Sequence, residues 1–204
     1  MTEITTLLWD VGGVMLSNGW DRDARKAACE RFGIEEEEFE KRHALVDEAF
    51  EIGRLTLDGY LDSTVFYSTR SFNREEFTAF IFAQSNANVG TLAVLGDLAG
   101  SRRYLMATLN NEGAELNEYR VRTFQLTRYF SAFLSSCYLG VRKPNESIYR
   151  LGLGIVQRPA EQCVFIDDRP PNLEPARRVG MRTIHFQNPA QLREDLTDCG
   201  VRFG

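Results

Sequence analysis

Carboxylates follow two apolar runs of this chain at the point where each run ends. Asp10 comes directly after the run at 7–9, and Asp167 and Asp168 close the run that begins at 163. Three carboxylates in one crevice repel one another unless a cation lies among them. Mg²⁺ suits such a place because it takes hard oxygen ligands and bridges to a substrate phosphate. The pattern therefore predicts a Mg²⁺ site, at which one carboxylate can also act as a nucleophile and form an acyl phosphate.

A lysine and two asparagines occupy comparable positions. Asn110 and Asn111 end another strand-like run, and Lys143 stands at the start of a helix in GVRKPNESIY. Lys143 would offset the charge of the nucleophile and the phosphoryl group, while Asn110 and Asn111 are candidates to bind phosphoryl oxygens. Gly12 and Gly13 let the backbone turn sharply after the first carboxylate and approach the same ligand. Any one of these residues alone is explained as a cap or a turn, but their succession favours a binding site.

Short apolar runs alternate with helical patterns through most of the chain. Such alternation predicts a Rossmann-like α/β core, a parallel sheet with helices on both faces. In open parallel sheets the ligand binds beyond the carboxyl ends of the strands, which is where the polar residues above are expected to meet. The predicted strands are 4–10, 103–109, 133–139, 163–168 and 181–186, and the predicted helices are 91–100, 116–130, 146–155 and 171–180.

The stretch from 21 to 90 has a different texture. It is rich in Glu, Ala, Arg and Lys, its apolar residues recur at helical spacing, and it holds no convincing strand. Asn73 stands just before REEFTAFIFAQ, where a residue that caps a helix is expected. The chain is therefore predicted to form one α/β core domain, residues 1–16 and 91–204, interrupted after its first strand by a helical cap domain, residues 17–90.

Composition and charge exclude several classes of function. The 204 residues are 43% hydrophobic, with a net charge of −5 and scattered Lys and Arg, which argues against nucleic-acid binding. No apolar stretch approaches the roughly 20 residues that a membrane span needs. The four cysteines lie far apart, so we expect free thiols in a reducing cytoplasm. His43 is predicted to lie on the surface of a charged helix and His185 in a strand, which leaves little for a zinc site or a His-based triad.

Four segments together resemble the motifs of the haloacid dehalogenase-like (HAD) hydrolases. They are LLWDVGGVM, LMATLNNE, GVRKPNESIY and VFIDDRPPNLEPARRVGM, which follow in the family's order over nearly the whole chain. The resemblance implies Asp10 as nucleophile, Lys143 beside it, and a Mg²⁺ ion held by Asp10, the Gly12 carbonyl and Asp168, with Asp167 as a further ligand or just behind. The helical insert is similar to the small cap that one class carries after the first motif, and the IDDRPxN form resembles small sugar-phosphate phosphatases.

Two positions depart from the family pattern. Family phosphatases have DxD in the first motif, and the second Asp protonates the leaving oxygen, but Gly12 occupies that position here. A general acid of this kind contributes about 10²–10⁴-fold. Asn110 stands where the family usually has Ser or Thr, although an amide can still donate a hydrogen bond to phosphate.

Three functions therefore remain open at this point. The first is a phosphomonoesterase that acts on a small phosphorylated metabolite through an aspartyl phosphate, with Glu112 or a cap residue as possible acid, although a carboxylate at a helix start is the simpler explanation of Glu112. The second is a 2-haloacid dehalogenase, whose halide leaving group needs no proton, but Asp167 and Asp168 argue against it. The third is a non-catalytic or weakly active binding protein, which the replacement of the acid by Gly12 would explain.

Overall fold

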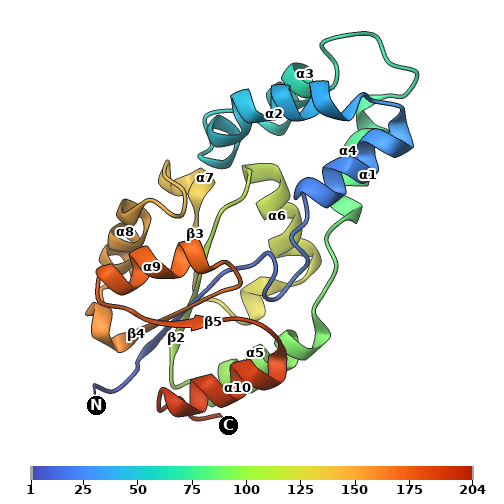
Figure 1. Ribbon diagram of the computed structural model, residues 1–204. Helices are drawn as coiled ribbons and strands as arrows, with labels where there is room; N and C mark the ends of the chain where they lie inside the picture. The colour runs from blue at the N-terminus through green and yellow to red at the C-terminus, as the bar shows by residue number, and fades with distance from the viewer. Residues whose placement is uncertain (1, 204) are drawn as a thin grey trace.

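The computed structural model describes residues 2–203. Within them, five strands form one sheet in the order β3-β2-β1-β4-β5, and every neighbouring pair is parallel (Figure 1). The predicted parallel α/β core is therefore confirmed. The strands are β1 Thr6–Trp9, β2 Leu105–Asn110, β3 Ala132–Ser135, β4 Cys163–Asp167 and β5 Arg182–His185.

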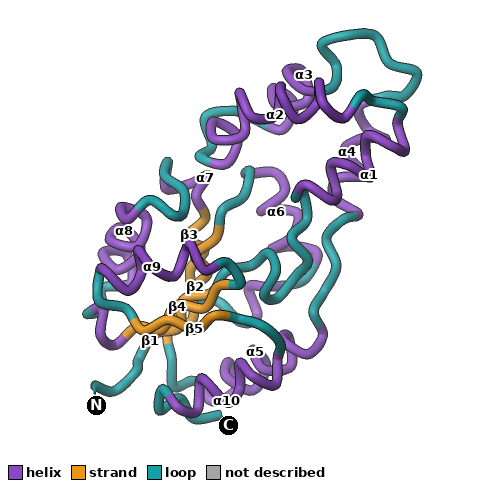
Figure 2. The backbone as a smooth tube through the Cα atoms, viewed as in Figure 1, coloured by secondary structure: helices purple, strands orange, loops and turns teal. Residues whose placement is uncertain are grey.

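Helices cover both faces of the sheet, as the alternation of elements predicts. Side chains of a strand point alternately to its two faces, so Leu7 and Trp9 pack with α5 (Val89–Ser101) and α10 (Pro189–Asp198), whereas Leu8 packs with α8 (Glu146–Val156) and α9 (Pro170–Arg178). Figure 2 shows the two layers on either side of the strands. The buried sheet fixes the positions of the strand ends, where the polar residues stand.

Four helices between β1 and α5 form a separate layer with its own apolar cluster around Trp20, Phe39, Tyr60 and Phe77. They are α1 Arg22–Phe32, α2 Glu36–Glu51, α3 Leu57–Thr64 and α4 Arg74–Ala83, and they lie over the carboxyl ends of the strands (Figure 1). Asn73 caps α4 through a reciprocal capping box, as predicted. The division into two domains at residues 17 and 90 stays a prediction.

Two segments that connect the layers run side by side, since the Ser17 N–H donates to the Asn86 carbonyl at 2.8 Å. The helical layer also contacts α6 (Ala114–Thr123) of the core, where Leu116 belongs to the apolar cluster of the cap. No helix in residues 2–203 is long and apolar enough to cross a bilayer.

Two predicted elements need correction, and one helix was not predicted. The strand predicted over 133–139 ends at Ser135, and residues 136–139 form one helical turn, α7 (Ser136–Leu139), closed by Gly140 at φ 69°. The helix predicted over 116–130 ends at Thr123, because Gln125 takes the left-handed conformation at φ 51° and only a short 3₁₀ turn follows. No helix is predicted after 186, yet Asn188 caps α10 and Pro189 begins it, which is a recognisable start signal.

Candidate active site

The three predicted carboxylates meet at the carboxyl edge of the sheet. β1 and β4 are parallel neighbours with Trp9 opposite Ile166, so the residues that follow them, Asp10 and Asp167, emerge side by side. One carboxylate oxygen each from Asp10, Asp167 and Asp168 lies within 4.8 Å of the other two. Parallel pairing of two buried strands thus produces the cluster expected from the sequence.

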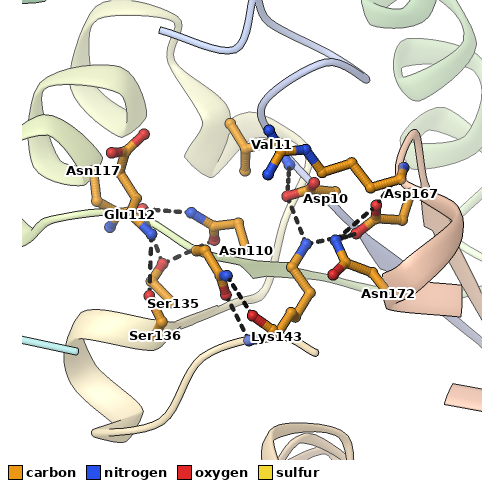
Figure 3. A network of polar contacts seen from close by, with 12 residues as sticks. Asp10, Val11, Asn110, Glu112, Asn117, Ser135, Ser136, Lys143, Asp167 and Asn172 are labelled. Atoms are coloured by element: carbon orange, nitrogen blue, oxygen red, sulfur yellow. Dashed lines mark hydrogen bonds and ion pairs between the residues drawn. The ribbon is translucent and has the colours of Figure 1, made fainter. Parts of the chain in front are cut away.

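Lys143 lies between two of these carboxylates. Its ammonium is 2.9 Å from Asp10 Oδ1 and 2.6 Å from Asp167 Oδ2, and the side chain is almost fully buried (Figure 3). Asn111 holds the backbone of this lysine from both sides, because its Oδ1 accepts from Lys143 N at 2.8 Å and its Nδ2 donates to Lys143 O at 2.9 Å. The Asn111 amide therefore positions Lys143, while the residue also lines the cavity over Asp10, and its contact with substrate stays a prediction.

Asn110, by contrast, is not brought into the site. Its amide Nδ2 donates to Asn117 Oδ1 at 3.2 Å, and its Oδ1 accepts from the Ser135 hydroxyl at 2.9 Å (Figure 3). The side chain is 1% exposed and does not line the cavity that contains Asp10. In this structure the amide joins the ends of β2, β3 and α6, and the substrate contact of Asn110 stays a prediction.

Asp167 and Asp168 have different surroundings. Asp167 accepts hydrogen bonds from Lys143, from Asn172 Nδ2 at 3.0 Å to both oxygens, and from the Arg169 N–H at 2.8 Å. Asp168 Oδ1 is buried and has no hydrogen-bond partner among residues 2–203. A buried carboxylate oxygen without a partner is costly, so the Asp168 oxygen is available to a cation, whereas Asp167 is occupied with Lys143, Asn172 and a backbone N–H. The motif quoted above includes Asn172, but the prediction gave it no role.

The two glycines after β1 serve different purposes. Gly13 has φ +73°, and a Cβ at this position would lie 2.2 Å from Asp168 Oδ2. Gly12 is not among the glycines with positive φ, and the nearest atoms to a Cβ there, in Asn18, lie 3.5 Å away. Only Gly13 is therefore required by the fold, while Gly12 leaves room for a side chain.

Replacing Gly13 by Ala is expected to destabilise the protein by about 2 kcal/mol or more, because the left-handed backbone disfavours a Cβ and the methyl group collides with Asp168. The melting temperature should fall by about 4–8 °C in a protein of this size, and Mg²⁺ should stabilise the variant less than the wild type. Gly12→Ala is the matched control, for which we expect a near-native melting temperature. Equal effects of the two changes would show that Gly13 does not shape the carboxylate cluster.

The electrostatics of the cluster favour a further cation. Burial raises the pKa of Asp10 to about 7 against the opposing effect of Lys143, and burial together with Asp167 raises the pKa of Asp168. Burial acts to lower the pKa of Lys143, but Asp10 and Asp167 outweigh it and raise that pKa above its ordinary value. One ammonium among three carboxylates leaves buried negative charge, and a divalent ion with oxygen ligands fits both this charge and the unpartnered Asp168 oxygen.

A cavity of about 420 Å³ lies over the cluster, within the range of small-molecule sites. Both layers line it. The core contributes Asp10, Gly12, Asn111, Glu112, Arg120, Arg142, Lys143, Pro144, Arg169 and Asn172, and the segment from 18 to 51 contributes Asn18, Trp20, Asp21, Arg22, Arg25, His43, Asp47, Phe50 and Glu51. A ligand held at Asp10 would therefore also face the cap helices α1 and α2.

The sequence matches the family described as haloacid dehalogenase-like hydrolase over residues 4–180. The chain belongs to this HAD family. It is 38% identical over 77 residues to flavin mononucleotide hydrolase 1 of Arabidopsis thaliana, a match that covers 38% of this chain and 31% of that protein. It is 27% identical over 206 residues to a drimenol cyclase of Aspergillus calidoustus, covering 96% of this chain and 36% of the cyclase. The chain thus spans about a third of these relatives' length.

A solved structure resembles the HAD fold of this chain along nearly its whole length. It is a HAD family enzyme of Bacteroides thetaiotaomicron in complex with magnesium and inorganic phosphate, with a TM-score of 0.77 and 21% sequence identity. The alignment covers 91% of this chain and 95% of that chain. At this level of identity the likeness shows the fold alone.

Glu112 stands just before a helix, in line with the simpler of its two sequence-based interpretations, and its role as an acid stays a prediction. It lies two residues before α6, is buried, and pairs with Arg120 Nη1 at 2.9 Å. Arg120 also donates to Ser85 Oγ at 3.1 Å and to the Ser17 carbonyl at 3.2 Å, and its Nη1 would lie 3.6 Å from a Cβ at Gly12. Burial raises the pKa of Glu112 to about 7 although Arg120 acts to lower it. This buried pair, with Arg120 close to Gly12, was not predicted because no local pattern marks it.

His43 is not on the surface as predicted. It is half-buried on α2, it lines the cavity, and its Nδ1 lies 2.9 Å from the Tyr60 hydroxyl. The charged run around it is genuine, but the helix presents His43 on its inner side. The cap therefore contributes a polar side chain to the site. The sequence alone had placed this side chain in solvent.

The cap and the core also contact each other next to Lys143. Arg142 Nη1 pairs with Asp47 and with Glu51 of α2 at 2.9 Å each. The Ser136 hydroxyl donates to the Glu51 carbonyl at 2.6 Å. These contacts hold the end of α2 over the cavity, close to the lysine that binds Asp10.

Proposed function

We propose that this HAD-family chain is a Mg²⁺-dependent phosphomonoesterase that acts on a small phosphorylated metabolite through an aspartyl phosphate at Asp10. The observation that carries the proposal is the buried cluster of Asp10, Lys143 and Asp168, in which one Asp168 oxygen lacks a partner among the described residues. The flavin mononucleotide hydrolase relative and the neighbour with magnesium and phosphate support it. The cysteines Cys29, Cys137, Cys163 and Cys199 are free, which agrees with work in a reducing cytoplasm.

Mg²⁺ would be held by carboxylate oxygens of Asp10 and Asp168 and by the Gly12 carbonyl. Asp167 has its oxygens occupied by Lys143, Asn172 and a backbone N–H, so it would support the site from behind. Bound there, the ion would neutralise phosphoryl oxygens and orient the phosphorus toward the nucleophile.

The proposed reaction has two steps, each of which uses this chain's own residues. Asp10 Oδ1 accepts from the Val11 N–H at 2.8 Å and from Lys143, which fixes the orientation of the carboxylate. A carboxylate oxygen of Asp10 attacks phosphorus, the new O–P bond forms, and the ester O–P bond breaks; the leaving oxygen takes a proton from solvent water and departs as the alcohol. Water then attacks the phosphorus of the aspartyl phosphate, which frees inorganic phosphate and restores Asp10. Lys143 stabilises the charge on both partners.

The leaving oxygen needs a proton, and Gly12 cannot supply it. Good leaving groups, such as aryl or anomeric sugar phosphates, should therefore outpace simple alkyl phosphates by a wide margin. Gly12→Asp should raise kcat/KM for alkyl phosphates by about 10²-fold, since a positioned acid contributes about 10²–10⁴-fold. The backbone tolerates the change, and Arg120 lies near enough to orient the new carboxylate. The measurement is kcat/KM across a series of leaving groups for both proteins.

Gly12→Asn is the matched control, with a side chain of the same size that cannot donate a proton from a carboxyl group. It should leave the dependence on the leaving group as steep as in the wild type. A flat dependence in the wild type, together with substantial activity, would contradict the absence of an acid. Glu112 would then be the first residue to replace.

One screen separates the proposed function from its competitors. The protein is incubated with phosphate monoesters, with Mg²⁺ or with EDTA, and in parallel with 2-haloacids. We expect phosphate release that EDTA abolishes, and no halide release. Halide release independent of Mg²⁺ would favour the dehalogenase, for which the absence of an acid at Gly12 is natural. Bound Mg²⁺ without turnover of any ester would favour a non-catalytic binding protein.

A further inference from the structure

A chain of hydrogen bonds inside the cap ends at the cavity. The Trp20 indole Nε1 donates to the Tyr60 hydroxyl at 2.9 Å, and the same hydroxyl lies 2.9 Å from His43 Nδ1. Tyr60 is fully buried, and Trp20 Nε1 can only donate, so the hydroxyl oxygen is the acceptor there. Its proton then goes to His43 Nδ1, its other partner among residues 2–203. Because Nδ1 accepts this proton, the proton of a neutral His43 lies on Nε2.

The surroundings keep His43 neutral near pH 7. Burial lowers its pKa, and the positive charge of Arg25 acts in the same direction, whereas Glu40 and Asp47 oppose the shift. The charged and titratable groups that face it from the neighbouring elements are Arg25 of α1, Glu40 and Asp47 of α2, Tyr60 of α3 and Arg142 of the core. A neutral imidazole whose Nδ1 is an acceptor presents a single donor, Nε2–H.

That donor belongs to a residue that lines the cavity. His43 lines the cavity above Asp10, and Nε2 has no hydrogen-bond partner in the described part of the chain, nor is it one of the fully buried unpartnered atoms found there. Trp20 and Phe50 line the same wall, and Phe50 stacks on Tyr60 at 4.7 Å between ring centroids. The wall therefore combines one directed donor with aromatic surface.

The charged groups next to His43 are already paired. Arg25 forms two hydrogen bonds with Glu40, at 2.6 and 3.0 Å, and Arg142 pairs with Asp47 at 2.9 Å. This part of the wall consequently suits a neutral group with acceptor oxygens and an apolar face. Sugars and similar polyols have both features.

We propose that His43 Nε2–H donates a hydrogen bond to an oxygen of the leaving group, so that the site selects phosphate esters of sugars or polyols over esters of plain alcohols. The proposal rests on the proposed phosphatase function and adds a specificity-determining residue to it. Tyr60 acts as a positioning residue, because its hydroxyl fixes the His43 ring and its proton.

The first test compares sugar phosphates with esters of the same ring size that lack the hydroxyl groups and the ring oxygen, and thus every acceptor oxygen of the sugar ring. The pairs are glucose 6-phosphate with cyclohexylmethyl phosphate, and ribose 5-phosphate with cyclopentylmethyl phosphate, all of which are primary esters with similar leaving groups. His43→Phe should lower kcat/KM for the better sugar phosphate about five- to tenfold, the effect of one neutral hydrogen bond, and leave its hydroxyl-free partner within about twofold. Tyr60→Phe should act in the same direction. Leu45→Ala, on the exposed side of α2, is the control and should change neither.

Equal losses on both members of a pair, or no loss on either, would overturn the proposal. A wild type that hydrolyses none of these esters and no aryl or anomeric sugar phosphate either would instead refute the proposed function. NMR of ¹⁵N-histidine-labelled protein then measures the protonation state and tautomer of His43 without any need for turnover. The chain has only two histidines, so the signals are readily assigned. We expect His43 as the neutral Nε2–H tautomer at pH 7, lost in Tyr60→Phe, with an Nε2 signal that glucose 6-phosphate shifts. A charged ring, an Nδ1–H tautomer or an unchanged signal at saturating ligand would contradict the proposal.

Discussion

Asp10→Asn is expected to lower kcat for phosphate release by about 10⁴-fold or more, because an amide is a poor nucleophile and the covalent step depends on this one side chain. The amide has nearly the shape of the carboxylate, and its oxygen can still accept from the Val11 N–H. The fold should therefore persist, and the circular dichroism spectrum should match that of the wild type. The measurement is steady-state phosphate release on the best ester, with saturating Mg²⁺.

Asp21→Asn is the matched control for this change. Asp21 lines the same cavity and caps α1 through the N–H of Ala24, a role that Asn performs equally well. It should keep near-native turnover, so that a large loss in Asp10→Asn alone identifies the nucleophile. Wild-type turnover in Asp10→Asn would exclude covalent catalysis at this residue.

Lys143→Met should have the second largest effect, on both activity and stability. Removal of the ammonium leaves Asp10 and Asp167 buried without their shared partner, and breaking a buried ion pair in this way costs about 3–5 kcal/mol. Activity should fall about 10²–10³-fold, because the charge on the nucleophile and the phosphoryl group is no longer offset. Kinetics and thermal unfolding, each with and without Mg²⁺, measure the two effects. Mg²⁺ should restore part of the stability, since it also offsets the carboxylate charge.

The neighbouring residue supplies the control for Lys143. Arg142→Met removes a cation from the same loop, but its pairs with Asp47 and Glu51 are partly exposed and contribute little to stability. Two results would contradict this prediction: a loss of turnover below tenfold in Lys143→Met, or a loss in Arg142→Met as large as that in Lys143→Met. Either would mean that catalysis does not depend on the position of Lys143 between the carboxylates.

The sequence was sufficient to predict the carboxylate cluster because strand ends in a parallel sheet fall on one edge. Asp10, Asp167 and Asp168 each follow a buried run, and parallel pairing of the runs brings them together. Lys143 was expected at the same edge of the sheet because it stands before a helix of the same α/β core. These inferences need only the period of the strands and the direction of the chain.

The rest depends on contacts between distant segments. Whether Asn110 faces the cavity or the Ser135 hydroxyl is decided by α6 and β3, which no local pattern reveals. His43 was assigned to the surface because it stands in a run of charges, yet α3 places Tyr60 against it from 17 residues away. The helical turn at 136–139 was read as strand because FLSSCYL carries no breaker before Gly140.

The central claim is that a phosphoryl group passes through Asp10, and trapping it is the most direct test. The protein with Mg²⁺ is mixed with a ³²P-labelled ester for milliseconds, quenched in acid, digested and mapped by mass spectrometry. We expect a transient, hydroxylamine-sensitive label on the peptide that contains Asp10, formed no more slowly than phosphate is released. The label should be absent in Asp10→Asn and present in Asp21→Asn. Phosphate release at the full rate with no label, or with the label on another residue, would contradict the account.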